Sequence, residues 1–376
     1  MKIAHICPNV DEQMGGSERY VWTLSKHQSK NYDVHIYTTT KYRDRVGTSV
    51  HDGVTIHKSY APVTIWNINP LTFMLPTLAK FKSDIFHIHS HLYFSSNQAI
   101  LAKIMIKCKA LLHIHGGVGI PPYKVSWTKL VAKKFYDQTL GKFTITASDL
   151  IASVSRSDLV RIAENYDINQ SQLRYIPNVV NTEVFKPRNS SEKEKKTLLY
   201  LGDLEPWKGI GSLIRWVRRN DSWANCEFKL RIIGQGSYLP YLLSLQKNHT
   251  KFSNGISLEV LGPKTHDEIP AILNDSNALV IPSYWEGMPT VVLEAMASGV
   301  PVISTGVGDV PHIIKHRKTG FLIDRSFSSF QESVDLIFND NSLVHSVTHN
   351  ARELIEKEYS LTNVGRILKN VYGELV

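Results

Sequence analysis

Short apolar runs rich in β-branched residues alternate with helix-like segments along this chain, and the alternation restarts near its middle. In the first half, KIAHIC, VHIYTTT, DIFHIH and ALLHIH alternate with segments such as SERYVWTLSKHQ and NQAILAKIMIKC. The second half begins again with TLLYLGD, IGSLIRWVRR and FKLRIIG and continues to PVIST and FLID. Such alternation is typical of βα units around a parallel sheet. The sequence therefore predicts an α/β protein with two Rossmann-like domains that face each other across a cleft.

A charged segment between the two halves indicates where the domains meet. KPRNSSEKEKK, at residues 186–196, combines Pro and Ser with dense charge, as linkers do. We expect one domain at residues 1–185, a second at 197–360 and a closing helix at 361–376. A chain of 376 residues is long enough for two cores of ordinary size.

The composition is that of a globular protein, with 42% hydrophobic and 20% charged residues. No apolar run reaches the roughly 18 residues that a membrane-spanning helix needs, and the N-terminal MKIAHICPNV lacks the apolar region of a signal peptide. Cys7, Cys108 and Cys226 are scattered and show no CxxC spacing. We expect a cytoplasmic protein with reduced cysteines.

The net charge of +9 lies entirely in the first half of the chain. Residues 1–174 contain 21 Lys and Arg against 12 Asp and Glu, whereas residues 175–376 contain 22 of each kind. A basic half is compatible with nucleic acid, an anionic membrane or an acidic substrate, and charge alone does not choose among them.

A pair of glycines, Gly15 and Gly16, follows the first predicted strand in QMGGSERY. Glycines let a ligand approach the backbone, and the N–H groups at the start of the next helix attract negative charge. A plain turn explains a lone GG equally well.

Histidines mark the ends of two predicted strands. DIFHIHSH supplies His87, His89 and His91, and ALLHIHGG supplies His113 and His115. Alternate positions share one face of a strand, so two or three of these rings could converge on a metal ion, but no nearby Asp, Glu or Cys completes a set of ligands. We therefore predict no metal, and we single out His115, whose ring can reach the cleft from a strand end.

The loop after the first strand of the second half reads YLGDLEPWKG. Its Lys208 is placed to meet a phosphate at the start of the next helix. The alternative is an ordinary exposed lysine.

The stretch EGMPTVVLE places two carboxylates, Glu286 and Glu294, around a predicted helix start at Pro289. Glu286 then lies in a loop and Glu294 on the helix, so their spacing need not match a helical repeat. Free N–H groups near Thr290 and Val291 make an anion site between the two acids. A sugar nucleotide matches this alternation, because its diphosphate suits the helix start and its hydroxyls suit the carboxylates.

Taken in order, the early GG, HIHGG, YLGDLEPWKG, IIGQGS, PSYWEGMPTVVLEAMASGVPVIST and HRKTGFLID resemble the retaining nucleotide-sugar glycosyltransferases of family 4, which have the GT-B fold. The resemblance spans nearly the whole chain. Its most specific part is EGMPTVVLEAMASGVPVI, which matches the paired-glutamate motif of that family. PNVVNTEVFKP, at residues 177–187, is similar to the family's segment at the interdomain crossing.

The resemblance implies an N-terminal acceptor-binding domain, a C-terminal domain that binds the nucleotide sugar, and a role for each matching residue. Glu294 would bind ribose, and Glu286 would face the donor sugar near the reacting carbon. Lys208 would neutralise the departing diphosphate, and His115 would lie beside the donor sugar; these two and Glu286 are the implied catalytic residues. Other implied donor-binding positions are Gly15, Gly16, Asp203, Gly234, Gly287, Met288, Pro289, Thr290 and Val291.

Three positions depart from the family pattern. Asp203 stands where the family commonly has Arg, so the usual pair of cations on the diphosphate is reduced to Lys208. Further on, Asp309 and His312 stand where the family often has Gly and Glu.

The resemblance implies transfer of a sugar from a nucleotide sugar, which we expect to be a UDP-sugar, to a glycan or lipid-linked acceptor in bacterial surface polysaccharide or lipopolysaccharide synthesis. The chain contains no DxD motif, so protein groups and not a metal ion should stabilise the leaving diphosphate, and no cofactor is expected. No covalent nucleophile stands out, and front-side attack by the acceptor hydroxyl fits as well.

Residues 123–143, YKVSWTKLVAKKFYDQTLGKF, contain the pattern of an amphipathic helix. Its apolar face would carry Trp127, Leu130, Val131 and Phe135. The charge would come from Lys129, Lys133 and Lys134, with Lys124 and Lys142. This pattern suits an anionic membrane, and the alternative is a helix packed on the core. We favour peripheral attachment to the inner face of the cytoplasmic membrane.

Two other functions stay open. A sugar-nucleotide epimerase can share the two-domain architecture but would convert the donor alone. A catalytically weak nucleotide-sugar binding protein is suggested by Asp203. Nucleic-acid binding is least favoured, because the basic half carries no recognised reading motif.

Overall fold

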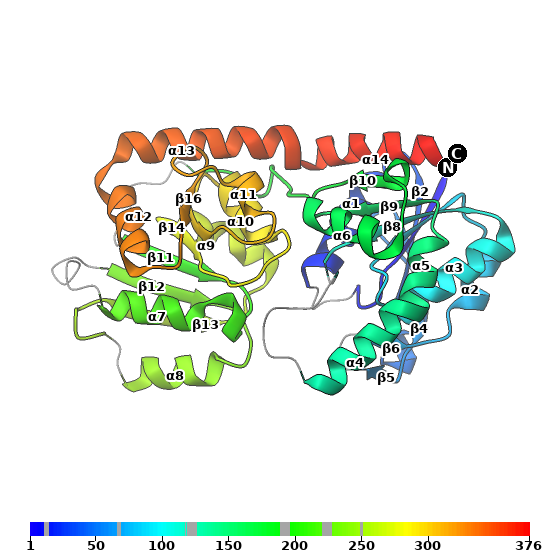
Figure 1. The fold of residues 1–376 in the computed structure, drawn as a ribbon, viewed down its shortest axis with the longest axis horizontal. Helices are drawn as coiled ribbons and strands as arrows, with labels where there is room; N and C mark the ends of the chain where they lie inside the picture. The colour runs from blue at the N-terminus through cyan, green and yellow to red at the C-terminus, as the bar shows by residue number, and fades with distance from the viewer. Residues whose placement is uncertain are drawn as a thin grey trace. The chain divides into compact units, whose positions relative to one another are not determined.

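The computed structural model describes residues 1–10, 15–65, 69–116, 118, 126–188, 196–219, 228–248 and 251–376. The chain folds into two compact units (Figure 1). The first unit consists of Met1–Val179 together with Leu361–Val376, and the second of Val180–Ser360. Each unit is an α/β layered structure around its own sheet, which confirms the predicted pair of Rossmann-like domains.

The first unit contains an eight-stranded sheet in the order β10-β9-β8-β7-β1-β2-β4-β3. All neighbouring strands are parallel except β3 and β4. The strands are β1 (Lys2–Ile6), β2 (Asp33–Thr40), β3 (Gly47–His51), β4 (Val54–Tyr60), β7 (Ile85–His89), β8 (Lys109–Ile114), β9 (Leu150–Ser153) and β10 (Leu173–Tyr175), with a separate small pair β5 (Val63–Ile65) and β6 (Asn69–Leu71).

Helices cover both faces of this sheet. They are α1 (Gly16–Gln28), α2 (Leu75–Lys80), α3 (Phe94–Ile106), α4 (Trp127–Tyr136), α5 (Lys142–Thr146), α6 (Arg156–Tyr166) and α14 (Leu361–Leu375). A π-helical turn at Asp137–Gly141 joins α4 to α5.

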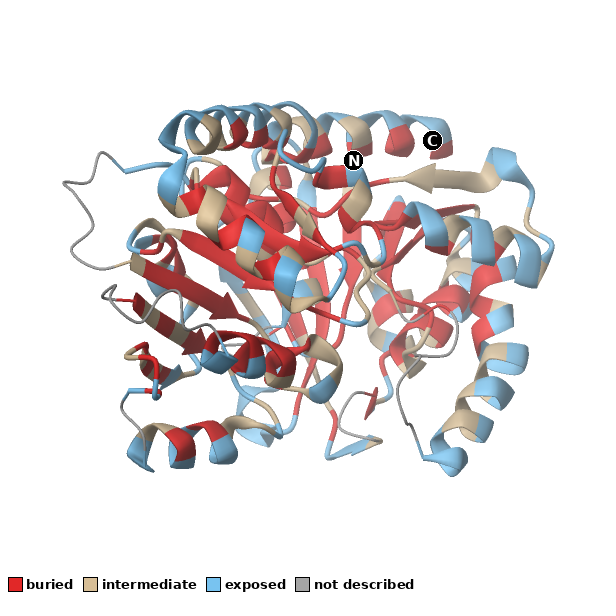
Figure 2. Cartoon of the chain, turned by 60° about the vertical axis from the view of Figure 1, so that its left-hand side comes forward, coloured by how far each residue is buried: buried red, intermediate tan, exposed pale blue. Residues whose placement is uncertain are grey.

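Alternate strand residues of the first unit enter two different cores. Ile3 and Cys7 pack with α1 and α14, whereas Ala4 and Ile6 enter the core on the opposite face. The same parity holds on β7, where Ile85 packs on the α1 and α14 side. This period of two explains why the strands read as continuous apolar runs, since both faces are buried (Figure 2).

The second unit contains a six-stranded parallel sheet in the order β13-β12-β11-β14-β15-β16. The strands are β11 (Lys196–Leu201), β12 (Phe228–Ile233), β13 (Ser257–Gly262), β14 (Ala278–Ile281), β15 (Val302–Thr305) and β16 (Phe321–Ile323). The helices are α7 (Ile210–Arg219), α8 (Leu239–Asn248), α9 (Ile269–Asn274), α10 (Thr290–Ala297), α11 (Val310–Ile313), α12 (Phe327–Asn339) and α13 (Asn341–Leu354).

The passages between the units differ from the predicted linker. The chain leaves the first unit after Val179, within the PNVVNTEVFKP segment, and returns to it at Leu361. The predicted first domain, residues 1–185, therefore runs past the end of the first unit, and most of the predicted linker at 186–196 lies outside the described residues. The closing helix α14 belongs to the first unit, where Val364, Leu368 and Tyr372 are fully buried against α1.

The sequence predicts no membrane-spanning helix and reduced cysteines. None of the helices in the described ranges is long and apolar enough to cross a membrane. Cys7 and Cys108 are free thiols, and Cys226 lies outside the described residues.

Candidate active site

Each unit has a point where the strand order reverses, and in the second unit predicted site residues lie there. In the second unit this switch point lies between β11 and β14, and the loops that follow these two strands carry Lys208 and Glu286. In the first unit it lies between β1 and β7, the strands that carry His5, His87 and His89. Ligands of open α/β sheets bind outside the carboxyl ends of the strands at such points. The topology thus gives each unit a candidate binding position.

Lys208 and Glu286 form an ion pair. Lys208 Nζ lies 2.9 Å from Oε1 and 2.8 Å from Oε2 of Glu286, and the Ser283 hydroxyl donates a hydrogen bond to Oε1 over 2.7 Å. The Glu286 side chain is 8% exposed and that of Lys208 22% exposed. A carboxylate this buried needs its partners, because an unpaired charge away from water is strongly unfavourable.

Close backbone packing holds the two loops together. The Tyr284 N–H donates to the Trp207 carbonyl over 2.8 Å. Gly209 has φ +76°, and a Cβ there would lie 2.0 Å from the Pro282 carbonyl oxygen. Only glycine permits this approach, which brings the turn of Lys208 beside the strand end that leads to Glu286.

A third loop supports Glu286 from the other side. The Asp309 N–H donates to the Gly287 carbonyl over 2.9 Å. Gly308, with φ +56°, lies so close that a Cβ would be 2.2 Å from the Glu286 carbonyl oxygen. Asp309, one of the departures from the family pattern, is fully buried and contributes to this support through its backbone.

Helix α10 begins at Thr290, with Pro289 as its N-cap. The Pro289 side chain makes no capping hydrogen bond to the N–H groups of the first turn. Met288 is buried, whereas Gly287, Pro289, Thr290 and Val291 are half-buried. The predicted loop–helix division of EGMPTVVLE is thus present, with an anion-attracting helix end between its two acids.

Glu294 is held by a residue that the sequence did not bring to attention, His266. Glu294 is 8% exposed, and its Oε1 lies 3.0 Å from His266 Nε2. The His266 ring also packs on Phe185, with ring centroids 5.2 Å apart. His266 follows the capping residue Thr265 in the segment after β13. Its position after the carboxyl end of a strand is the feature of the sequence that could have marked it as a site residue.

Gly234 and Asp203 both take part in loop structure. Gly234 has φ +149°, and a Cβ there would lie 1.9 Å from the Gly202 carbonyl oxygen, so loop packing by itself requires the glycine. Asp203 is exposed, and its backbone carbonyl accepts a 2.7 Å hydrogen bond from the Tyr200 hydroxyl. A ligand role for either residue stays a prediction.

The glycine pair in the first unit is only partly described. Gly15 is the extended N-cap of α1, and Gly16 is its first residue, while residues 11–14 lie outside the described ranges. Glu18 lies in the first turn, and a Cβ on Gly15 would be 2.8 Å from its Oε2. This helix end therefore already faces a carboxylate of its own.

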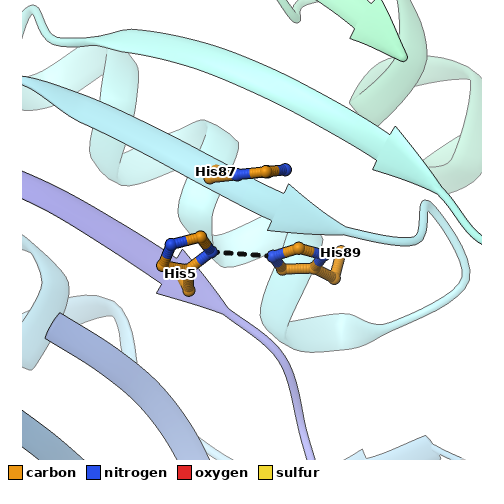
Figure 3. A group of neighbouring side chains, drawn as sticks. All are labelled: His5, His87 and His89. Carbon is orange, nitrogen blue, oxygen red and sulfur yellow. Dashed lines mark hydrogen bonds between the residues drawn. The ribbon is translucent and has the colours of Figure 1, made fainter. Parts of the chain in front are cut away.

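Five histidines gather on one face of the first sheet. His5, His87, His89, His113 and His115 occupy alternate positions on or directly after β1, β7 and β8, on the side covered by α1 and α14. The rings of His5 and His89 are hydrogen-bonded over 2.9 Å, with His87 beside them (Figure 3). His115 continues the group, because its Nε2 lies 2.9 Å from His89 Nδ1.

Sequence reasoning missed His5, and His91 is the one named strand-end histidine that lies apart from the group. His5 pairs in register with His87 across parallel strands 82 residues apart in sequence, and no local motif marks it. His91 lies beyond the end of β7, where its Nε2 is 3.8 Å from an Asp137 carboxylate oxygen.

Burial keeps the five gathered rings neutral at pH 7. It lowers the pKa of His5 to about 4 and that of His115 to about 3, and it holds the pKa values of His87, His89 and His113 well below the usual histidine range. Two trios, His5–His87–His89 and His89–His113–His115, have nitrogen atoms within 4.8 Å of one another, close enough to hold a metal ion.

Helix α4 presents an apolar stripe to solvent. Trp127 is 76% exposed and Phe135 71% exposed, and Val131 lies one turn from each and is also exposed. The helix has no fully buried residue, and it meets the rest of the unit through its half-buried side, where Tyr136 packs edge-on against Phe94. Lys129, Lys133 and Lys134 are on the same helix, and Lys133 pairs with Asp137.

Two family models together match almost the whole chain. The model of group 1 glycosyl transferases matches residues 181–354, and that of Glycosyltransferase Family 4 matches residues 14–184. The chain belongs to these glycosyltransferases.

Curated relatives include enzymes with lipid substrates in their names. The chain is 25% identical over 374 residues to the gpi3 subunit of phosphatidylinositol N-acetylglucosaminyltransferase from Schizosaccharomyces pombe, covering 96% of this chain and 78% of that protein. It is also 25% identical over 329 residues to the Escherichia coli UDP-Gal:alpha-D-GlcNAc-diphosphoundecaprenol alpha-1,3-galactosyltransferase, covering 83% and 81%.

Solved structures of low sequence identity share the fold. Sucrose-phosphate synthase from Thermosynechococcus elongatus has a TM-score of 0.79 at 18% identity, covering 100% of this chain and 98% of that one. Anabaena HepE in complex with UDP has a TM-score of 0.74 at 15% identity, with 100% of both chains covered. The glycosyltransferase therefore has the GT-B fold, as expected.

The support of Glu286 by Gly308 predicts a specific sensitivity. Gly308→Ala should lower the melting temperature by roughly 4 °C or more, because a non-glycine residue at positive φ costs about 1–2 kcal/mol and the added Cβ also displaces the Glu286 carbonyl. Gly306→Ala is the matched control, since the nearest contact of its Cβ would be Pro311 at an ordinary 3.6 Å. Differential scanning calorimetry checks both, and equal melting temperatures for the two variants would contradict the role given to Gly308.

Proposed function

We propose that this glycosyltransferase moves a sugar from a UDP-sugar to a glycan or lipid-linked acceptor, with retention of the anomeric configuration and without a metal ion. The Lys208–Glu286 ion pair at the switch point of the second unit carries this proposal. A cation, a carboxylate and a helix start without a side-chain cap lie on neighbouring loops there, and together they suit a diphosphate bonded to a sugar.

The donor would divide its groups among these residues. Glu294 keeps Oε2 for the ribose hydroxyls, because His266 occupies Oε1. The N–H groups at Thr290 and Val291 would take the diphosphate, together with Lys208. Glu286 would accept hydrogen bonds from hydroxyls of the sugar.

The proposed chemistry follows from where charge develops. The bond from the anomeric carbon to the diphosphate oxygen breaks, and the acceptor hydroxyl oxygen bonds to that carbon on the same face. The hydroxyl proton passes to the departing diphosphate. Lys208 and the start of α10 would stabilise the negative charge that grows on the leaving group, as preorganised donors do in other enzymes.

Two relatives support the choice of substrates. The E. coli relative is named for a UDP-galactose donor and a diphosphoundecaprenol acceptor, and the S. pombe relative for a phosphatidylinositol acceptor. HepE was solved with UDP. The exposed apolar stripe of α4 with its lysines adds a surface suited to an anionic membrane, where such acceptors lie.

Separate variants should divide donor binding from turnover. Glu294→Ala should weaken UDP-sugar binding about 10- to 100-fold, because charge-assisted hydrogen bonds to the ribose are lost. Glu286→Gln, which keeps a partner for Ser283, should retain binding and lower kcat on the order of 100-fold. Calorimetric titration with UDP-, GDP- and dTDP-sugars and product analysis with an acceptor check both. Normal activity in both variants would remove this assignment, and donor conversion without an acceptor would favour an epimerase.

Metal independence has its own test. Transfer by the purified protein should be unchanged in excess EDTA, because Lys208 and the start of α10 supply the charge that a bridging metal would otherwise supply. Loss of transfer that Mg²⁺ or Mn²⁺ restores would contradict this part of the proposal.

Membrane attachment through α4 predicts salt-sensitive binding to anionic vesicles. Lys129→Gln combined with Lys134→Gln should weaken binding to phosphatidylglycerol vesicles roughly 30-fold, since each lysine near such a surface contributes about 1 kcal/mol. Trp127→Ser should weaken it further. Leu243→Ser with Lys247→Gln, on the exposed side of α8, serves as the matched control. Undiminished binding by the α4 variants would place the membrane contact elsewhere.

A further inference from the structure

The five gathered histidines, one glutamine and one tyrosine of the first unit form a single hydrogen-bonded chain. It begins at His115 and ends at the Ile176 carbonyl. Its links are His115–His89 at 2.9 Å, His89–His5 at 2.9 Å, His5–Gln28 at 2.8 Å, Gln28–Tyr372 at 3.1 Å, Tyr372–His87 at 2.7 Å, His87–His113 at 3.2 Å and His113–Ile176 at 3.2 Å. The direction of every link follows from one fixed end.

That end is a backbone carbonyl, which can only accept. His113 Nε2 must therefore carry its proton and donate to the Ile176 oxygen. A neutral ring has one N–H, so His113 Nδ1 accepts from His87 Nε2–H. His87 Nδ1 in turn accepts from the Tyr372 hydroxyl.

The amide of Gln28 then carries the direction from α14 to β1. The Tyr372 hydroxyl has one proton, already given to His87, so its oxygen accepts from the Gln28 Nε2 amide group. Gln28 Oε1 consequently faces His5 and accepts from His5 Nε2–H. A side-chain amide can donate and accept at the same time. Through this property, Gln28 and Tyr372 link His87 and His113 to His5, His89 and His115.

The last three rings follow the same logic. His5 Nδ1 accepts from His89 Nε2–H, and His89 Nδ1 accepts from His115 Nε2–H. His115 Nδ1 is left as a bare lone pair. In the described part of the chain this buried atom has no hydrogen-bond partner.

If every hydrogen bond in the chain ran in the opposite direction, the arrangement would fail at the Ile176 carbonyl. Reversing every link would turn the His113 Nε2 lone pair toward the Ile176 oxygen at 3.2 Å, where two acceptors repel. A charged ring within the chain is also unfavourable, because burial disfavours protonation of all five histidines.

We propose that Gln28 is a positioning residue that fixes His115 Nδ1 as a hydrogen-bond acceptor for a substrate hydroxyl. The tautomers follow from the chain itself, and the substrate contact rests on the proposed function. Donation from His115 Nε2–H to His89 strengthens Nδ1 as an acceptor, as second partners do for metal-bound histidines. The same chain opposes a metal ion, since the other lone pairs of both histidine trios are already used.

Histidine tautomers can be observed directly. Long-range ¹H–¹⁵N correlation spectra of the full chain labelled with ¹⁵N-histidine, recorded at pH 7, should show His5, His87, His89, His113 and His115 as neutral Nε2–H tautomers. Single His→Gln variants assign the signals. An Nδ1–H or charged pattern for His89 or His115 would overturn the proposal, and so would spectra changed by equimolar Zn²⁺ at these rings.

Variants of the amide link test the role of Gln28. In Gln28→Leu, and independently in Tyr372→Phe, His87 and His113 should keep their tautomer because Ile176 still orients them. His5, His89 and His115 should lose their single tautomer. Gln98→Leu removes another glutamine of the same unit, one that accepts from the Met74 and Leu75 N–H groups, and should leave all five rings unchanged. Unaltered His89 and His115 signals in both link variants would refute the assignment to Gln28.

Kinetics separate this inference from the proposed function. With the UDP-sugar identified by titration, Gln28→Leu should raise the donor KM about 10-fold, since His115 then presents a donor part of the time, while Gln98→Leu should not. Altered tautomers with an unchanged KM would overturn the substrate contact of His115. Absence of any sugar transfer by the wild type would instead overturn the proposed function, with the tautomer result standing.

Discussion

The parallel order of the strands is the constraint on which both candidate sites depend. A parallel sheet collects all its carboxyl ends at one edge, and the reversal of strand order leaves two neighbouring loops there with no helix between them. In the second unit those loops carry Lys208 and Glu286, and close glycine contacts hold them together. In the first unit, β1 and β7 place histidines side by side in the same setting. The chemistry of each site therefore follows from topology before any ligand is considered.

The two units solve the problem of buried polar groups in different ways. The second neutralises a buried carboxylate with a cation, Lys208 on Glu286, so a ligand with negative charge must share the lysine. The first keeps its rings uncharged and satisfies them by one directional hydrogen-bonded chain. A neutral chain suits hydroxyl recognition, because it offers a lone pair without attracting a proton, whereas an ion pair suits a ligand that brings its own charge.

Local pattern was enough to predict the fold and the loop–helix setting of Glu286 and Glu294, since a buried strand, Pro289 and an apolar run lie within one short segment. It was not enough for His5 and His266, which become partners of site residues only through strand register and loop packing. Gln28 and Tyr372 are 344 residues apart in sequence and meet because α14 returns to the first unit. Such contacts have no local signal. The exposure of α4 was also undecided, because an amphipathic pattern is the same whether its apolar face meets a core or solvent.

The Lys208–Glu286 ion pair determines how much the Asp203 carboxylate changes the charge that a phosphate meets. Lys208 has three N–H donors and directs two of them to the oxygens of Glu286, so a diphosphate that arrives at this loop meets an ion pair with little net charge. Asp203 adds an exposed carboxylate where the family pattern has a cation, and water screens it more than it would a buried acid. Under the proposed function, Lys208 and the start of α10 would share the diphosphate, and the N–H groups of the helix would bind it through geometry and hydrogen bonds. Donor recognition in this chain should accordingly depend more on hydroxyl contacts at Glu294 and Glu286 than on charge at the diphosphate.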